Sequence, residues 1–296
     1  MHDGPDGAPM TGSTGSSSSM VRGETGHEGV PWRPEIAIVT ITKDDPAGIR
    51  RTIESVDQQE FSRYEQVVVN GGSSADVAAY LALWRRRDPD RHILIDNPPN
   101  GIYPAMNAGI LSTSAQIILV LNGGDQLLPG ALGRVSEHYL VNKWRWAYGG
   151  VTSGEPEGHS PSNYIFTPFS RRTFRAGLKT IPHLTAYVTR GLYNEVGLYR
   201  DDLGSGADQE FFLRACLVAE PAHLPGILAV FETGGVSSQV GRIGREIGWH
   251  RMRLASATAF GGNAVCDLIV TVLLLARRFL LDAVGRLRRL GQLRKH

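Results

Sequence analysis

The sequence predicts an α/β fold with a mostly parallel central sheet and helices on both faces. Apolar runs of strand length, rich in β-branched residues, recur between residues 35 and 122. These runs are continuous rather than alternating, which is typical of strands buried on both faces. Helix-like segments separate the runs, and this order favours parallel strands joined by crossover helices.

The predicted elements follow one another in a regular order. Glu35–Ile41 is the first strand, and Asp45 is placed to cap a helix whose first residue is Pro46. Glu65–Asn70 is the second strand. The next elements are a helix at Ala75–Arg86, a strand at His92–Asp96, a short helix at residues 101–112 and a strand at residues 116–122.

Composition limits the class of protein. A chain of 296 residues that is 42% hydrophobic can bury one large core or two modest ones. The formal charge of +2 is too small to suggest a nucleic-acid partner. The two cysteines, Cys216 and Cys266, lie far apart in apolar, helix-like stretches, so we expect both to pack in the core and neither to form a disulfide, in a reducing compartment.

Polar residues follow each predicted strand, at the sheet edge where α/β proteins bind ligands. They are Thr40, Thr42, Lys43 and Asp44, then Asn70 to Ser74, then Asp96, Asn97 and Asn100, and finally Asn122, Gly123, Gly124 and Asp125. One polar strand end is ordinary loop chemistry, but four at one edge predict a binding crevice.

Two common phosphate-binding motifs are missing from the sequence. The first strand is followed by "TITKDDPAG" rather than G-x-G-x-x-G, and no G-x-x-x-x-G-K-[ST] string occurs. A metal is then the natural group to neutralise a diphosphate. Asp125 suits Mg²⁺ or Mn²⁺, which prefer oxygen ligands. The two glycines before it let the backbone and a phosphate approach each other closely.

A set of motifs resembles the family 2 glycosyltransferases of GT-A fold, in particular the branch that decorates bacterial surface polysaccharides and glycolipids. The motifs occur in family order between about Glu35 and Ser238. They are "IVTITKDD", "QVVVNGGSSAD", "NGIYPAMNAGI", "LVLNGGDQL", "IPHLTAYVTR", "GLYRDDLGSGADQEFFLRA" and "GGVSS". Each motif alone is a weak signal, and the ordered set is a strong one.

The resemblance implies a role for several residues. Donor binding is assigned to Thr40, Thr42, Asn70, Gly71, Asn107, Asn122 and Gly123. Asp125 is expected to bind the metal, and Asp208 to be the base that deprotonates the acceptor hydroxyl. His183 could contact the diphosphate or the acceptor, and a buried, hydrogen-bonded core histidine is an equal alternative.

The sequence also departs from the family pattern. Asn70 replaces the usual aspartate, Lys43 stands where an aromatic or aliphatic residue is common, and Pro104 replaces an acid. Gly124 lies where many relatives carry the middle aspartate of D-x-D, which leaves Asp125 as the sole acid of that loop. Asp208 opens a helix-like run, so helix capping is the alternative to catalysis, and Glu210 is the alternative base.

The resulting hypothesis is a metal-assisted, inverting glycosyltransferase of the hexosyltransferase class. It transfers a sugar from a nucleotide-diphosphate sugar to a hydroxyl of a surface polysaccharide or glycolipid by a single displacement. One rival is a non-catalytic sugar-nucleotide or glycan binding protein, which is plausible because Gly124 leaves Asp125 as the sole acid of the metal loop. A nucleotidyltransferase is the other, but "TITKDDPAG" lacks the glycine- and arginine-rich signature of that class.

The sequence divides into three segments. Residues 1–33, with hardly any large apolar side chain and no secretory pattern, are expected to be disordered, and translation starts at Met1 or Met20. Residues 34–240 form the expected GT-A catalytic domain. Residues 241–296 are expected to be helical, with a basic amphipathic end.

The C-terminal segment contains a short apolar run. "LIVTVLLLA" is nine residues long, well below the ~20 that a spanning helix needs. Leucines then alternate with Arg286, Arg288, Arg289, Arg294 and Lys295. This pattern favours a helix on the inner face of the cell membrane of a cytoplasmic protein; packing on the catalytic domain or in a dimer is the alternative.

Overall fold

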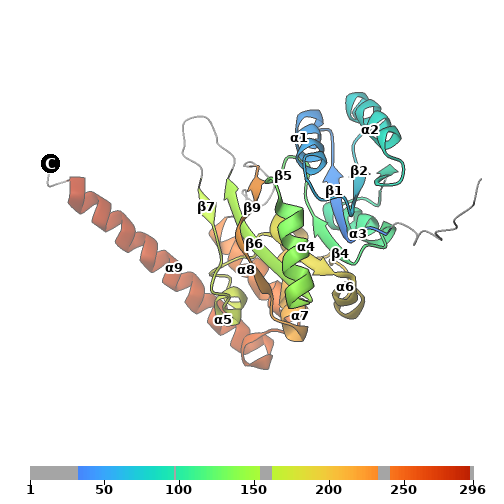
Figure 1. The fold of residues 1–296 in the computed structure, drawn as a ribbon. Coiled ribbons are helices and arrows are strands. Elements are labelled where there is room, and N and C mark those ends of the chain that lie inside the picture. Colours follow the sequence, from blue (N-terminus) through green and yellow to red (C-terminus); the bar gives the residue numbers. More distant parts are fainter. Residues whose placement is uncertain (1–32, 97, 154–161, 233–240, 294–296) are drawn as a thin grey trace, which may run out of the picture. The chain divides into compact units, whose positions relative to one another are not determined.

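A computed structural model of the chain describes residues 33–96, 98–153, 162–232 and 241–293 (Figure 1). Of the segment predicted to be disordered, 1–33, all but the last residue lies outside these ranges, and so does the "GGVSS" motif. The strands are β1 (Ile36–Thr42), β2 (Tyr64–Asn70), β3 (His92–Asp96), β4 (Ile117–Val120), β5 (Gln126–Leu127), β6 (Trp146–Ser153), β7 (Asn163–Tyr164), β8 (Ala186–Thr189) and β9 (Ala222–Phe231).

Helices connect most of these strands. They are α1 (Pro46–Asp57), α2 (Ala75–Arg87), α3 (Ile102–Ser112), α4 (Ala131–Asn142), α5 (Arg171–Arg175), α6 (Arg190–Val196), α7 (Ala207–Val218), α8 (Arg242–Ala255) and α9 (Ala264–Leu293). Short 3₁₀ turns lie at η1 (His183–Thr185), η2 (Gly204–Gly206) and η4 (Phe260–Gly262). The seven elements predicted between residues 35 and 122 are confirmed, and Asp45 caps α1 by accepting a hydrogen bond from Gly48 N at 2.8 Å.

The sheet is parallel through its N-terminal half and mixed beyond it. Its strand order is β3-β2-β1-β4-β8-β6-β9-β5, with β7 paired to β6. Strands β3, β2, β1 and β4 are mutually parallel, and β9 is parallel to β6. Strand β8 runs antiparallel to both β4 and β6. The predicted α/β class is confirmed.

Helices cover both faces of this sheet, as expected. Val39 and Val69 face α3, whereas Ile38 and Val68 belong to clusters formed with α4 and with α1 and α2. Gly109 of α3 lies so close to β1 and β2 that a Cβ there would be 3.1 Å from Val69 Cγ2. The missing side chain therefore lets α3 rest directly on the strands.

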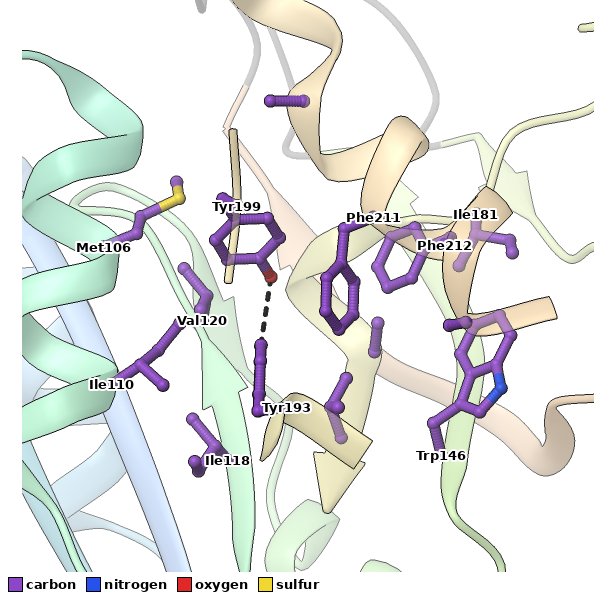
Figure 2. Packing of buried hydrophobic residues seen from close by; sticks show 14 of the residues in the cluster. Met106, Ile110, Ile118, Val120, Trp146, Ile181, Tyr193, Tyr199, Phe211 and Phe212 are labelled. Atoms are coloured by element: carbon purple, nitrogen blue, oxygen red, sulfur yellow. Dashed lines mark hydrogen bonds between the residues drawn. The ribbon is translucent and has the colours of Figure 1, made fainter. Parts of the chain in front are cut away.

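An aromatic core joins the sheet to the helix that carries Asp208 (Figure 2). Trp146 of β6 stacks on Phe212 of α7 with ring centroids 5.3 Å apart. The hydroxyls of Tyr193 and Tyr199 are hydrogen-bonded at 3.2 Å, and the Tyr199 ring meets Phe211 edge-on at 5.1 Å. Because these rings are buried, they fix α7 against β6 and the segment around Tyr199.

The cysteine prediction is half right. Both thiols are free, and Cys216 is buried in the core. Cys266, however, is exposed on the first turn of α9, so core packing is wrong for it. The apolar residues around Cys266 are themselves exposed, and that is why sequence composition misplaced it.

A buried ion pair holds α8 against α9. Arg253 and Asp267 are both fully buried, and Asp267 accepts hydrogen bonds from Arg253 at 2.8 and 2.9 Å, from His250 at 2.6 Å and from Phe260 N at 2.8 Å. Burial by itself would raise the pKa of Asp267, but these hydrogen bonds hold it below its usual value. Across the described ranges, no helix combines the length and apolar character needed to cross a bilayer.

Removing this carboxylate is expected to destabilise the fold. Asp267→Ala leaves the Arg253 charge buried without a partner, which costs about 3–5 kcal/mol of unfolding free energy. Because the pKa is lowered in the folded state, the stabilisation is complete above 3.8, the usual pKa of an aspartate, and is lost as the pH falls through the lower folded pKa. Denaturant titrations should therefore show a larger difference between wild type and variant at pH 7 than at pH 3, with exposed Asp90→Asn as control.

Candidate active site

A cavity of about 600 Å³ opens at the carboxyl ends of β1 to β4. All four strand ends contribute to its wall, as the sequence predicts. The lining residues are Ile41, Thr42, Lys43, Val69, Gly71, Pro98, Pro99, Asn100, Gly101, Ile102, Tyr103, Ala105, Met106, Asn122, His183, Ser205 and Asp208. The cavity therefore joins the first half of the sheet to the start of α7.

Backbone hydrogen bonds bring these strand ends together. Gly71 N donates to Thr42 O at 2.9 Å, and Gly123 N donates to Ile41 O at 2.9 Å. A Cβ at Gly123 would lie only 3.2 Å from Ile41 O, so glycine allows this close approach. Asp44 adopts a positive φ of 52° and accepts hydrogen bonds from Ser73 N and Ser74 N at 2.7 Å each, which links the first two loops.

Asp125 is a buried carboxylate at the end of the fourth loop. Its side chain is 3% exposed, and Oδ1 accepts a hydrogen bond from Glu232 N at 3.0 Å. Thr52 of α1 donates to the Asp125 carbonyl at 2.7 Å and so holds the loop. Burial raises the pKa of Asp125 to about 6, and the charge of Glu232 adds to this, while His183 and the Glu232 N–H oppose it.

The loop fits a hard cation bound together with a diphosphate. Within the described ranges, buried oxygens of two cavity residues, Thr42 Oγ1 and Asn122 Oδ1, have no hydrogen-bond partner. A buried carboxylate with incomplete charge compensation is costly unless a ligand completes it. No cluster of three or more His, Cys, Asp or Glu side chains suited to a metal occurs in the same ranges.

Asp208 lies across the cavity, at the second residue of α7. Its Oδ1 accepts a hydrogen bond from Tyr103 OH at 3.3 Å and its Oδ2 one from Gln209 Nε2 at 2.9 Å. Its side chain forms no capping hydrogen bond, since the N-cap is Gly206. Glu210 is fully buried and paired with Arg214 at 2.8 Å, so it is engaged elsewhere.

His183 lies between Asn122 and Asp208 in the cavity wall. Its Nε2 accepts a hydrogen bond from Asn122 Nδ2 at 3.0 Å, and its Nδ1 lies 3.8 Å from Asp208 Oδ2. Since Asn122 Nδ2 is only a donor, the proton of a neutral imidazole is on Nδ1, facing Asp208. His183 lines the cavity and is 20% exposed at its side chain, which places it in the site rather than in the core.

Four predicted donor residues do not line the cavity: Thr40, Asn70, Asn107 and Gly123. Thr40 is fully buried and accepts a hydrogen bond from Gln66 at 3.3 Å. Asn70 donates to Asp96 Oδ1 at 3.2 Å and accepts from Gly72 N at 3.2 Å. The Asn107 side-chain amide donates a hydrogen bond to Tyr199 O at 2.8 Å and accepts one from Tyr199 N at 3.1 Å. These side chains position loops, whereas Thr42, Gly71 and Asn122 line the cavity.

The sequence did not single out three residues that the structure brings to the site. Tyr103 lies in the quoted "NGIYPAMNAGI" motif. It donates a hydrogen bond to Asp208, 105 positions away, and no local pattern reveals so distant a contact. Gln209 follows Asp208 in the sequence, and its side chain donates a hydrogen bond to the Asp208 carboxylate. Glu232 follows a strand with no motif of its own, so no sequence signal marked it.

Residues 37–191 match the profile of glycosyl transferase family 2. A protein of Mycobacterium tuberculosis described as an uncharacterized glycosyltransferase is 34% identical over 212 residues, which are 69% of this chain and 78% of that protein. A PGL/p-HBAD biosynthesis glycosyltransferase of Mycobacterium bovis is 24% identical over 253 residues, covering 80% and 90% of the two chains. The chain belongs to glycosyl transferase family 2.

Solved structures agree on the GT-A fold. The Staphylococcus aureus TarS fragment 1–349 with UDP has a TM-score of 0.60 at 14% identity, and the match covers 75% of this chain and 65% of that one. The mannosyltransferase PcManGT of Pyrobaculum calidifontis, with GDP-Man and Mn²⁺, has a TM-score of 0.56 at 15% identity and covers 90% and 82%. The chain thus spans just under two thirds of the TarS fragment.

The role of Asn107 is open to a direct test. Asn107→Ala removes two hydrogen bonds to the Tyr199 backbone, and we expect it to lower the unfolding free energy by about 1–3 kcal/mol. Asn100→Ala in the exposed cavity wall should leave stability unchanged. Urea denaturation compares the two; a stable Asn107→Ala protein with lost donor affinity would instead support direct donor binding.

Proposed function

We propose that this glycosyltransferase moves a sugar, with inversion, from a nucleotide-diphosphate sugar to a hydroxyl of a surface polysaccharide or glycolipid. The observation that carries the proposal is the shared cavity. Asn122 of the Asp125 loop and Asp208 both line it, and His183 lies between them. A leaving group and an attacking hydroxyl therefore have separate walls on which to bind.

The donor is proposed to bind along the strand ends. Ile41, Val69 and Met106 form an apolar wall that suits the flat face of a nucleobase. Thr42 and Asn122 present oxygens that are unpaired among the residues the structure describes, and Gly71 lets a ligand approach the backbone closely. The structural relatives contain UDP, UDP-GlcNAc or GDP-Man, which supports a nucleotide-sugar donor without selecting the base.

Asp125 is the proposed ligand for Mg²⁺ or Mn²⁺. Its buried carboxylate and the neighbouring unpaired oxygens fit such an ion, and the PcManGT structure contains Mn²⁺. When bound, the cation supplies positive charge that stabilises the leaving diphosphate. The protein's own part is to hold the loop through Thr52 and to keep bulk water from the Asp125 side chain.

Asp208 is the proposed general base. Tyr103 and Gln209 each donate a hydrogen bond to one of its oxygens, which fixes the carboxylate toward the cavity. Burial and the adjacent Asp208 charge raise the pKa of Tyr103, so this hydroxyl stays protonated and keeps donating. The carboxylate then accepts the proton of the acceptor hydroxyl as that oxygen attacks the anomeric carbon and the diphosphate leaves.

The Asp208→Asn variant tests this role and separates the enzyme from a binding protein. The amide keeps the size of the side chain but cannot take a proton, so turnover should fall about 10²–10⁴-fold. Donor binding, measured by calorimetry over a panel of sugar nucleotides with Mn²⁺, should remain. Glu210→Gln, in the neighbouring ion pair with Arg214, is the control: it tests whether removing another acid from α7 also lowers turnover. Retained turnover in Asp208→Asn would contradict the assignment.

We also propose that α9 attaches the protein to an anionic membrane surface. Between Val265 and Leu280 its exposed residues, spaced three and four apart, form one apolar stripe: Val265, Leu268, Ile269, Val272, Leu273, Ala276, Phe279 and Leu280. Asp267 and Thr271 on the opposite face are buried against α8. Exposed Arg277 and the later arginines of the sequence favour acidic lipid headgroups as the partner.

Charge placed in this stripe should release the protein from lipid. The double variant Ile269→Glu/Leu273→Glu is expected to bind phosphatidylglycerol vesicles about tenfold or more weakly, because burial of each side chain contributes roughly 1.5–3 kcal/mol. The matched control is Leu140→Glu/Val141→Glu, two exposed apolar residues of α4. Unchanged vesicle sedimentation, or a change of oligomeric state instead, would overturn the membrane assignment.

A further inference from the structure

Position 124 has no side chain, and another residue's carboxylate fills the space. Gly124 has a φ of +104°, and a Cβ placed on it would overlap the Glu232 carboxylate, lying 2.9 Å from Cδ. The acid of a segment distant in sequence therefore occupies the space in which a side chain at position 124 would begin.

The sheet brings Glu232 to this place. Strand β9 pairs antiparallel with β5, so that Val230 lies opposite Gln126 and Ala229 opposite Leu127. Glu232 therefore comes directly beside Asp125, to whose Oδ1 its backbone N–H donates at 3.0 Å. The two carboxylates approach the loop from different strands and converge on it.

An arginine at present neutralises Glu232. Arg51 of α1 forms an ion pair with the Glu232 carboxylate, and both side chains are about two fifths exposed, at 40% and 43%. An exposed ion pair of this kind contributes little to stability. A divalent cation next to Asp125 and the Arg51 guanidinium would therefore compete for the same carboxylate.

A second feature of the loop independently points to a ligand. Thr42 is 7% exposed and lines the cavity, and within the described residues its Oγ1 has no hydrogen-bond partner. This oxygen would lie 3.3 Å from a Cβ at Gly123, so it faces the same loop. A buried hydroxyl without a partner is costly unless something else binds it.

We propose that Glu232 is the second carboxylate of the metal site and binds the cation together with Asp125. This inference deepens the proposed function and rests on it. Two carboxylates, together with phosphate oxygens and waters, form a suitable oxygen ligand set for Mg²⁺ or Mn²⁺. The glycine and the glutamate are then complementary, because any side chain at position 124 would displace the Glu232 carboxylate.

Mn²⁺ binding to the full chain, followed by the electron paramagnetic resonance signal of free Mn²⁺ with and without inorganic pyrophosphate, tests the inference without turnover. Glu232→Gln should weaken Mn²⁺ binding about tenfold or more, comparable to the loss of a supporting group at other metal sites. Glu137→Gln, an exposed acid of α4, makes the same charge change and should have no effect. Thermal melting confirms that each variant is folded.

Arg51→Gln tests whether Glu232 is a metal ligand or only the partner of Arg51 in a structural ion pair. If Glu232 binds the cation, removing Arg51 frees the carboxylate and Mn²⁺ affinity rises. If Glu232 only holds β9 against α1 through its ion pair with Arg51, then Glu232→Gln and Arg51→Gln break the same pair and both lower the affinity for Mn²⁺. That result overturns the inference.

Asp125→Asn distinguishes the inference from the function on which it rests. Loss of Mn²⁺ binding in Asp125→Asn but not in Glu232→Gln rejects Glu232 and leaves the proposed metal site. No change in either variant rejects the metal part of the proposed function as well. Weakened binding in both, in a protein that turns over no donor, supports Glu232 and rejects the transfer reaction.

Discussion

The parallel pairing of β1 with β2 on one side and with β4 on the other is the constraint on which the site depends. It sets Thr42 opposite Asn70 and continues past the strands through Gly71 N to Thr42 O and Gly123 N to Ile41 O. The register brings three loops from separate parts of the chain to one edge. A slip of one residue would reverse which side chains face α3 and would misplace the loops as well.

Local sequence signals were sufficient for this half of the fold. Continuous apolar runs marked β1 to β4, and Asp45 followed by Pro46 marked the start of α1. The rule that ligands bind at carboxyl ends of parallel strands then located the cavity. Each of these inferences uses residues that are close in sequence, or a rule that applies to the whole sheet.

The rest of the site depends on contacts that no local pattern records. Tyr103 meets Asp208, and Glu232 meets Asp125, across more than a hundred residues in each case. Asn107 illustrates the converse: it lies in a family-like motif on the helix beside the cavity, yet its amide holds the Tyr199 backbone. A motif identifies a residue that matters and leaves open whether it touches the ligand or supports one that does.

Two buried aspartates show how differently one fold treats the same side chain. Asp267 is surrounded by Arg253, His250 and the Phe260 N–H, so its pKa is lowered and its charge stabilises the packing of α8 on α9. Asp125 has one backbone N–H and a second carboxylate beside it, and burial raises its pKa to about 6. A structural acid is fully compensated by its own protein, whereas an incompletely compensated one marks a place where a ligand is to complete the charge. The contrast assigns Asp267 to the stability of the fold and supports the proposed role of Asp125 in binding a cation.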